Sequence, residues 1–166
     1  MDRGGVWRRA HAFFNRETTH LQEVSLLANT TVGDLMTRDP IMLEPGDTVL
    51  DAACAMRDRD IGTLLITDKG NLVGVLTDRD IVVRAIADRG DPSKMTVEQI
   101  ASKEVAALSP DDPLDKAVKL MRSRALRRFP VVKSGKPVGI ITMGDLAVGL
   151  DPKSALADVS AANPNR

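Results

Sequence analysis

The chain of 166 residues repeats itself. The segment VGVLTDRD at 73–80 returns 65 positions later as VGIITMGD at 138–145, and the same offset aligns 32–85 with 97–150 without a gap. Fourteen of these 54 aligned pairs are identical, and most other apolar positions exchange only for apolar residues. A duplication of this kind constrains the fold, because two copies of one unit usually pack around a pseudo-two-fold axis with a cleft where they meet. A polar motif present in both copies can then furnish two related sites.

Each copy predicts the same order of elements, β-α-β-β-α. In the first copy the pattern predicts an extended segment, a helix capped by Asp47, two strands around a tight turn and a last helix, at 39–43, 48–59, 63–66, 72–77 and 78–88. The second copy gives the same order, with Asp112 as the cap and Pro113 at the first helical position. The spacing of apolar residues predicts that the last helix of the first copy buries Ile81, Val82, Ala85 and Ile86.

The predicted fold class is therefore α/β (α+β), with two repeats packed by pseudo-two-fold symmetry. A copy of about 55 residues buries too little surface to be stable by itself, so we expect the two copies to share one continuous core. The repeats divide the chain into an N-terminal tail or helix at 1–30, a first repeat at 31–90, a second at 96–150 and a C-terminal tail at 151–166. The Arg-rich start of the N-terminal tail fits either a transit peptide or a loose or docking segment.

Composition excludes several classes of protein. The 23 Lys and Arg balance the 23 Asp and Glu, so the chain as a whole has no electrostatic reason to bind nucleic acid or acidic membranes. No window approaches the ~20 apolar residues of a membrane span, and the single cysteine fits a reducing cytoplasm. The repeats contain no histidine, no Cys/His cluster with zinc spacing and no Ser-His or Cys-His pair. We therefore expect no metal site, no catalytic residue and no enzymatic activity.

The polar motif that both copies share is Gly-x-x-Thr-x-x-Asp. Its glycine removes a side chain where the backbone of a strand could approach a ligand. Thr77 and Thr142 lie at a strand-to-helix junction, where exposed N–H groups attract anions. Asp80 and Asp145 lie in the first helical turn, and a carboxylate can accept two hydrogen bonds from a vicinal diol. The alternative interpretation is that the threonine and the aspartate only cap the helix that follows.

With these motifs the chain resembles a known family, the tandem pair of cystathionine-β-synthase (CBS) domains called a Bateman module. The resemblance covers 31–150, and the chain is similar to small stand-alone CBS-pair proteins. It rests on the two Gly-x-x-Thr-x-x-Asp motifs in register, and on the segments Met36-Thr37, Pro45-Gly46-Asp47-Thr48, Asp60-Ile61-Gly62 and Arg127-Arg128-Phe129-Pro130-Val131-Val132.

The resemblance implies a regulatory module that senses an adenosine-containing ligand and modulates a partner protein. The ligand would be AMP, ADP, ATP, S-adenosylmethionine or an NAD-type molecule, held in a cleft between the repeats. Contacts are implied from each motif, from the backbone of the first extended segment and from basic residues before a strand, at Thr77, Asp80, Thr142, Asp145, Thr37, Ile41, Arg127 and Arg128. The resemblance also implies a homodimer, with no required cofactor.

The two sites need not be equal. Arg127 and Arg128 stand where the first copy has the uncharged Gly62 and Thr63. A phosphate would be neutralised mainly by these arginines, which favours one working site, or a site for a less charged ligand, over two full nucleotide sites. The alternative is that the arginines form a solvated strand entry or ion pairs in a dimer interface. The second hypothesis for the whole chain is a dimeric structural or protein-interaction module without a bound nucleotide.

Overall fold

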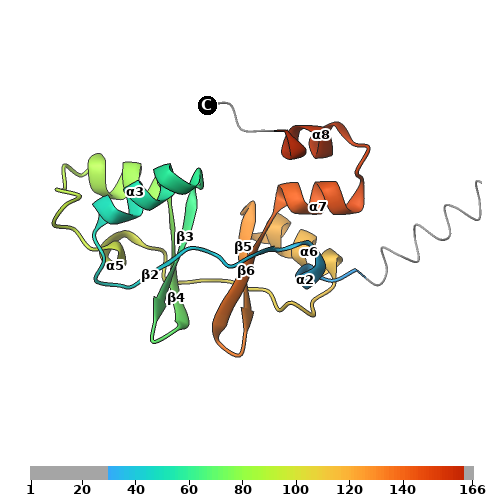
Figure 1. Cartoon of the computed structure of the whole chain (residues 1–166), viewed down its shortest axis with the longest axis horizontal. Coiled ribbons are helices and arrows are strands. Elements are labelled where there is room, and N and C mark those ends of the chain that lie inside the picture. The colour runs from blue at the N-terminus through green and yellow to red at the C-terminus, as the bar shows by residue number, and fades with distance from the viewer. Residues whose placement is uncertain (1–29, 163–166) are drawn as a thin grey trace, which may run out of the picture.

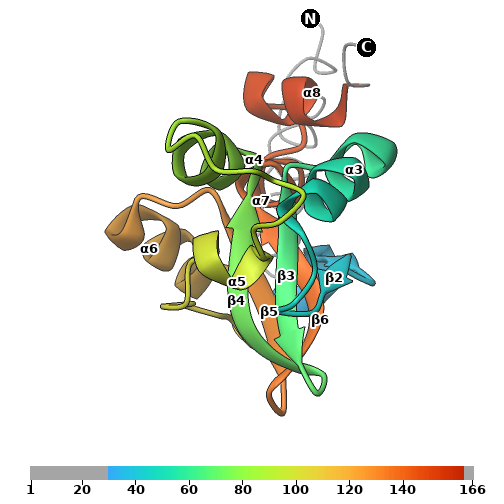
Figure 2. The same cartoon turned by 90° about the vertical axis from the view of Figure 1, so that its left-hand side faces the viewer.

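The structure, a computed structural model, describes residues 30–162, so the segment predicted at 1–30 lies outside it apart from Thr30. Figure 1 shows two halves side by side, each built from a small sheet and its helices. One sheet has the order β2-β3-β4, from Met42–Leu43, Thr63–Asp68 and Asn71–Thr77. The other has the order β1-β6-β5, from Thr37–Arg38, Lys136–Thr142 and Arg128–Lys133. The hairpins β3–β4 and β5–β6 lie next to one another (Figure 2).

The helices follow the same repeat. Helices α3 (Val49–Arg59) and α6 (Leu114–Arg124) precede the hairpins, and α4 (Asp78–Asp80) and α7 (Met143–Leu150) follow them. Helix α4 continues as a π-helix, η1 (Ile81–Ile86). The short helices α2 (Val32–Leu35) and α5 (Val97–Ile100) open the repeats, and α8 (Ala155–Ala161) follows the second. The α/β class predicted from the sequence is confirmed.

The opening segments of the two repeats are exchanged. Strand β1 belongs to the first repeat but pairs antiparallel with β6 of the second, with Thr37 opposite Ile140. Reciprocally, Ser102 of the second repeat bridges to Val75 in β4 through backbone hydrogen bonds of 2.9 and 3.0 Å. These two contacts are related by the offset of 65 residues that relates the sequence copies, so the backbone pairing itself has the expected pseudo-two-fold symmetry.

The buried side chains form two clusters, one in each half, where the sequence predicts one continuous core. The cluster around α3 is completed by Val97 and Ile100, from the opening of the second repeat. The cluster around α6 is completed by Val32 and Met36, from the opening of the first repeat. The prediction of one core is therefore wrong, because exchange of the opening segments lets each half complete its own core with residues of the other repeat.

Both predicted helix caps are also wrong. Thr48 is the N-cap of α3, and its hydroxyl accepts a hydrogen bond of 3.0 Å from the N–H of Asp51. Asp47 instead accepts a hydrogen bond of 2.8 Å from a backbone N–H in the preceding turn. Asp112 does the same at 2.8 Å, and Pro113 is the N-cap of α6. An aspartate before a helix can bond backbone N–H groups on either side, so its position alone does not separate a turn from a cap.

The burial of two side chains in η1 also differs from the prediction. Ile81 and Ala85 are buried as expected, but Val82 and Ile86 are 58% and 53% exposed. The prediction assumed 3.6 residues per turn. In η1 the hydrogen bonds run from residue i to i+5, as from the N–H of Ala87 to the Val82 carbonyl at 2.9 Å. Ile81 and Ala85 therefore form the buried side of η1, and Val82 and Ile86 face away from the core.

Gly74 and Gly139 occupy equivalent positions in the two repeats, but the space around their Cα atoms differs. A Cβ at Gly139 would lie 2.8 Å from the carbonyl oxygen of Thr37 and 2.6 Å from the sulfur of Met36. A Cβ at Gly74 would lie no closer than 3.4 Å to its nearest neighbours, one of which is Ala101. Strand β1 can therefore approach β6 only because position 139 has no side chain.

We expect Gly139→Ala to lower the free energy of unfolding by about 1–3 kcal/mol, because the added methyl group forces β1 away from β6. Gly74→Ala is the matched control, and it should change this free energy by less than about 1 kcal/mol in either direction. Urea unfolding of both variants measures the difference. Equal destabilisation by the two substitutions would contradict the assignment of the close contact to Gly139.

Candidate functional site

Both copies of the motif form the same helix cap. In the first, Oδ2 of Asp80 accepts hydrogen bonds from the backbone N–H and the hydroxyl of Thr77, at 2.9 and 2.6 Å. In the second, Oδ2 of Asp145 accepts the same pair from Thr142, at 2.7 and 2.8 Å. The threonine hydroxyl in turn accepts from the aspartate N–H at 3.2 Å in each. Capping is therefore a real role of the motif, but it engages only one oxygen of each carboxylate.

A cavity of about 570 Å³ lies on the first motif, between the two repeats. Its volume falls in the range of about 300–1,000 Å³ that is typical of small-molecule sites. Both repeats supply its walls, at Gly62, Val75, Thr77–Asp80, Arg84, Ser102, Glu104–Ala106 and Ala125–Pro130.

The cavity brings together half of the ligand contacts predicted from the sequence, namely Thr77, Asp80, Arg127 and Arg128. Arg127 precedes β5 of the second repeat and Arg128 begins it, yet both line the cavity on the motif of the first. This arrangement follows from the pseudo-two-fold axis, which sets the beginning of β5 beside the beginning of β3.

The other four predicted contacts lie outside this cavity. Thr142 and Asp145 are at the start of α7. Thr37 pairs with β6, and the carbonyl of Ile41 accepts a hydrogen bond of 3.1 Å from the N–H of Leu65 in β3. Both residues therefore contribute to contacts between strands, as Ser102 does in the second repeat.

Sequence reasoning missed the segment 102–106, which forms one wall of the cavity. The repeat itself could have identified it. Adding the offset of 65 to Thr37 and Ile41 gives Ser102 and Ala106, and both line the cavity. One wall of the cavity on the first motif is thus supplied by the second repeat.

Arg84 was also missed, and it connects the motif to that wall. Its Nη1 donates a hydrogen bond of 2.7 Å to the carbonyl of Ile100 and lies 3.3 Å from the hydroxyl of Ser102. The same nitrogen is 3.4 Å from Oδ1 of Asp80, the oxygen that capping leaves unused. One guanidinium group therefore links the motif carboxylate to the exchanged segment.

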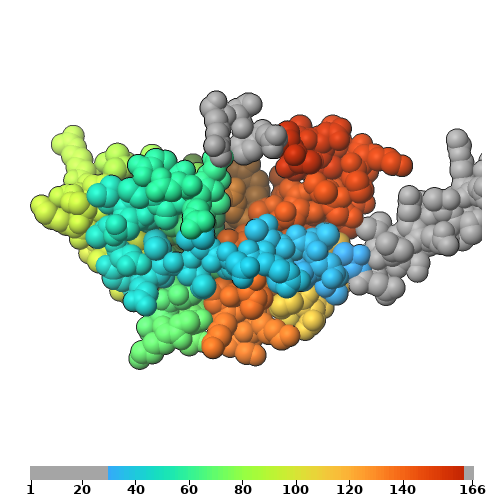
Figure 3. All heavy atoms as spheres, in the orientation of Figure 1, coloured from blue at the N-terminus to red at the C-terminus, as the bar shows by residue number. Residues whose placement is uncertain are grey.

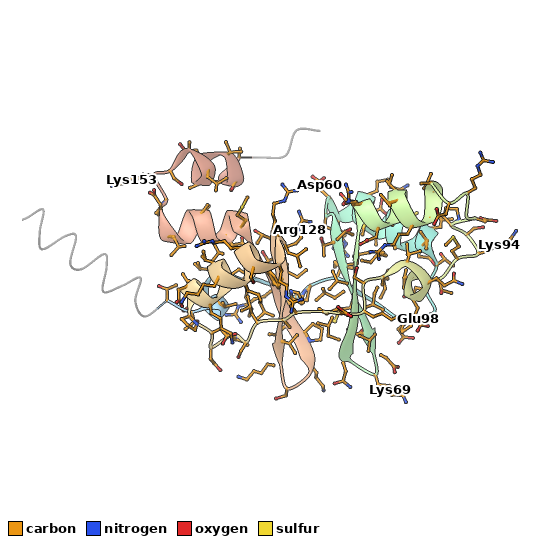
Figure 4. All side chains as sticks on the ribbon, turned by 180° about the vertical axis from the view of Figure 1, so that it is seen from behind. Asp60, Lys69, Lys94, Glu98, Arg128 and Lys153 are labelled. Carbon is orange, nitrogen blue, oxygen red and sulfur yellow. The ribbon has the colours of Figure 1, made fainter. Side chains whose placement is uncertain are left out.

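Arg128 crosses the boundary between the repeats. Its Nη1 donates a hydrogen bond of 2.7 Å to the hydroxyl of Thr63, which occupies the equivalent position in the first repeat. Figure 4 shows this side chain between the two halves. Gly62 makes the approach possible, because a Cβ there would lie 3.3 Å from the same Nη1 and 2.8 Å from Oδ2 of Asp78.

The charges around the two motifs differ. The cavity is lined by four arginines and three acidic residues, Arg79, Arg84, Arg127, Arg128, Asp78, Asp80 and Glu104. The offset of 65 residues makes Gly144, Gly149, Gly62 and Thr63 the counterparts of these arginines. None of the four positive charges is therefore repeated at its equivalent position.

The described part of the chain lacks two further classes of site. Residues 30–162 contain no group of three or more His, Cys, Asp or Glu side chains placed to hold a metal ion. Across the same residues, none of the helices is both long and apolar enough to cross a membrane.

Comparison with known proteins agrees with this geometry. The CBS domain family matches residues 32–86 and 97–150. YlbB of Bacillus subtilis is 37% identical over 137 residues, which are 79% of this chain and 92% of that protein.

Two solved structures have similar folds. The CBS domain pair of MJ0100, in complex with 5′-methylthioadenosine and S-adenosyl-L-methionine, superposes with a TM-score of 0.67 at 30% identity, over 75% of this chain and 98% of that one. Hypoxic Response Protein I, with two coordinated zinc ions, gives a TM-score of 0.66 at 34% identity, over 71% and 97%. The chain belongs to the CBS domain family and is a tandem pair of CBS domains, as its repeated motif predicts.

Proposed function

We propose that this CBS-domain pair is a regulatory protein that binds an adenosine-containing ligand in the cavity on the first motif and modulates a partner protein in response. The observation that carries the proposal is the composition of the cavity. It combines a motif carboxylate, an exchanged backbone segment and four arginines in one space of ligand size. The MJ0100 pair, a similar structure, holds two adenosyl compounds, and this supports the choice of ligand class.

Each part of the cavity suits one part of such a ligand. Oδ1 of Asp80 is outside the cap and suits the ribose diol, because a charged acceptor makes strong hydrogen bonds to hydroxyl groups. The segment 103–106 has no regular secondary structure, so its peptide groups can face a base edge. Arg127 and Arg128 line the same cavity as Thr77 and Asp80, so a phosphate attached to the ribose would meet two cations there.

The remaining parts of the proposal concern the whole protein. We place the protein in the cytoplasm, where a single cysteine stays reduced, and we assign it a non-catalytic role, because the cavity lacks a nucleophile–base pair. We also propose that two copies form a homodimer. A dimeric interaction module without a nucleotide remains the alternative, and a complete lack of ligand response would favour it.

Thermal unfolding with AMP, ADP, ATP, S-adenosylmethionine, 5′-methylthioadenosine, NAD and NADH identifies the ligand. A compound present at 100 times its dissociation constant adds about 2.7 kcal/mol to the free energy of unfolding, so its midpoint should rise by several degrees. No shift with any compound would contradict the proposed ligand class.

Asp80→Ala should weaken binding of the identified ligand by more than about tenfold, because charge-assisted hydrogen bonds contribute about 1.5–3 kcal/mol each. Asp145→Ala is the matched control, since it removes the same cap from the equivalent helix. Both variants should lose similar stability, about 1 kcal/mol. Calorimetric titration should find the affinity changed only by Asp80→Ala. Equal weakening by both variants would refute the assignment to this cavity.

Arg127→Ala and Arg128→Ala test how the cavity neutralises phosphate. We expect each substitution to weaken the binding of ATP by about tenfold or more. The affinity for 5′-methylthioadenosine, which lacks phosphate, should change by less than about twofold. Arg122→Ala, on the exposed side of α6, removes the same charge away from the cavity and controls for net charge. Titrations of both ligands against the three variants provide the comparison. Equal losses for the two ligands would show that the arginines act on the fold and not on phosphate.

A further inference from the structure

Arg84 stands beside the first motif, but the cap of the helix does not require it. Both motifs form the same cap, with one aspartate oxygen bonded to the threonine. The residue equivalent to Arg84 is Gly149, where an added Cβ would run into Cδ1 of Leu35. Leu35 belongs to the opening segment of the first repeat, which crosses the front of both halves in Figure 3. The second motif is therefore capped without an arginine, so Arg84 serves a purpose other than capping.

The guanidinium group of Arg84 is anchored through one nitrogen. Within residues 30–162 its polar contacts run through Nη1, at 2.7 Å to the carbonyl of Ile100, 3.3 Å to the hydroxyl of Ser102 and 3.4 Å to Oδ1 of Asp80. Ile100 is 3% exposed and ends α5, and the last carbonyls of a helix need partners from outside it. Because the guanidinium group is planar and rigid, this buried anchor also sets the directions of its other N–H groups.

The other donors of Arg84 remain for a ligand. An arginine has five N–H groups, and Nε and Nη2 carry those that Nη1 does not. The Arg84 side chain lines the cavity and is 47% exposed, whereas the Asp80 side chain is 15% exposed. The two residues are four apart in the chain, which places their side chains on one face. An acceptor oxygen and a set of oriented donors therefore adjoin one another in the same cavity.

The cap limits what Asp80 can do alone. A carboxylate with two free oxygens can accept from both hydroxyl groups of a diol, but Oδ2 of Asp80 already accepts two hydrogen bonds from Thr77. The Thr77 hydroxyl is engaged as well, because it donates to Oδ2 and accepts from the N–H of Asp80. A second hydroxyl group at this place needs another partner, and Arg84 is adjacent.

We propose that Asp80 and Arg84 together recognise the two hydroxyl groups of a ribose. Oδ1 of Asp80 accepts a hydrogen bond from one hydroxyl group, and the oxygen of the neighbouring hydroxyl group accepts one from Nε or Nη2 of Arg84. Both bonds are charge-assisted and therefore strong. Arg84 is thus a specificity-determining residue that selects ribose over deoxyribose. The proposal rests on the adenosine site proposed above and adds one residue to it.

Deoxynucleotides test this division of roles in the full-length chain. Calorimetric titration compares AMP with its 2′-deoxy and 3′-deoxy analogues, and the unmodified chain should bind each analogue at least about tenfold more weakly than AMP. In Arg84→Ala, one analogue should bind within about twofold of AMP while the other keeps its loss. In Asp80→Ala the two analogues should exchange these behaviours. Each ratio compares ligands on one variant, so a general loss of affinity or stability cancels.

Two further variants separate recognition from charge. Arg84→Lys keeps the positive charge but lacks the planar fork, so the discrimination lost in Arg84→Ala should stay reduced. Arg122→Ala removes a charge from the exposed side of α6 and should keep the discrimination against both analogues.

Three results would overturn the proposal. Arg84→Ala could keep the discrimination against both analogues, or Arg84→Lys could restore it in full, and then the arginine acts as an anchor of α5 or as a cation. Tighter binding of AMP by Arg84→Ala would show that Arg84 competes with the ribose for Oδ1. The unmodified chain could also bind the three nucleotides equally, or bind none of them. The thermal series described above reports separately on the ligand class, so a failure of this proposal is distinguished from a failure of the adenosine site.

Discussion

The exchange of the opening segments is the constraint on which the rest of the structure depends. Strand β1 reaches β6 because Gly139 leaves its backbone uncovered, and Ser102 reaches β4 through the equivalent pair of hydrogen bonds. These contacts bring Val32 into one core and Val97 into the other, so each half is completed by the opposite repeat. The same exchange places the segment 102–106 beside the first motif. The exchange therefore both completes the hydrophobic cores and builds the wall of the cavity. A single repeat could form neither a complete core nor the cavity.

Much of the fold could be predicted because the sequence contains two copies of one unit, whose patterns can be compared. A gapless offset of 65 residues fixes which positions are equivalent, and local patterns predict the hairpins and the main helices. Exchange could not be predicted, since periodicity reports which face of an element is buried and not which repeat buries it. The exposure of Val82 and Ile86 was missed for a related reason, because an apolar pattern does not show which of its residues a neighbouring element covers.

The candidate site, too, could be predicted only in part. The motif residues Thr77 and Asp80 could be predicted from their spacing alone, and the structure shows how capping leaves one carboxylate oxygen for another partner. The grouping of Arg127 and Arg128 with this motif could not, because sequence proximity joins them to the second repeat. The hydrogen bond between Arg128 and Thr63, at equivalent positions, explains the crossing: these side chains meet where the pseudo-two-fold axis brings the two strand entries together.

Divergence between the repeats links the proposed site to the packing of α8. Arg79 lines the cavity on the first motif, and its counterpart on the second is Gly144, where α8 comes within 3.2 Å of an added Cβ. An arginine at 144 would hold α8 away, and a glycine at 79 would remove a cation from the cavity. One position therefore cannot serve both purposes. Duplication supplies two copies of it, so that one half can keep a charged, open cleft while the other packs α8 closely against α7.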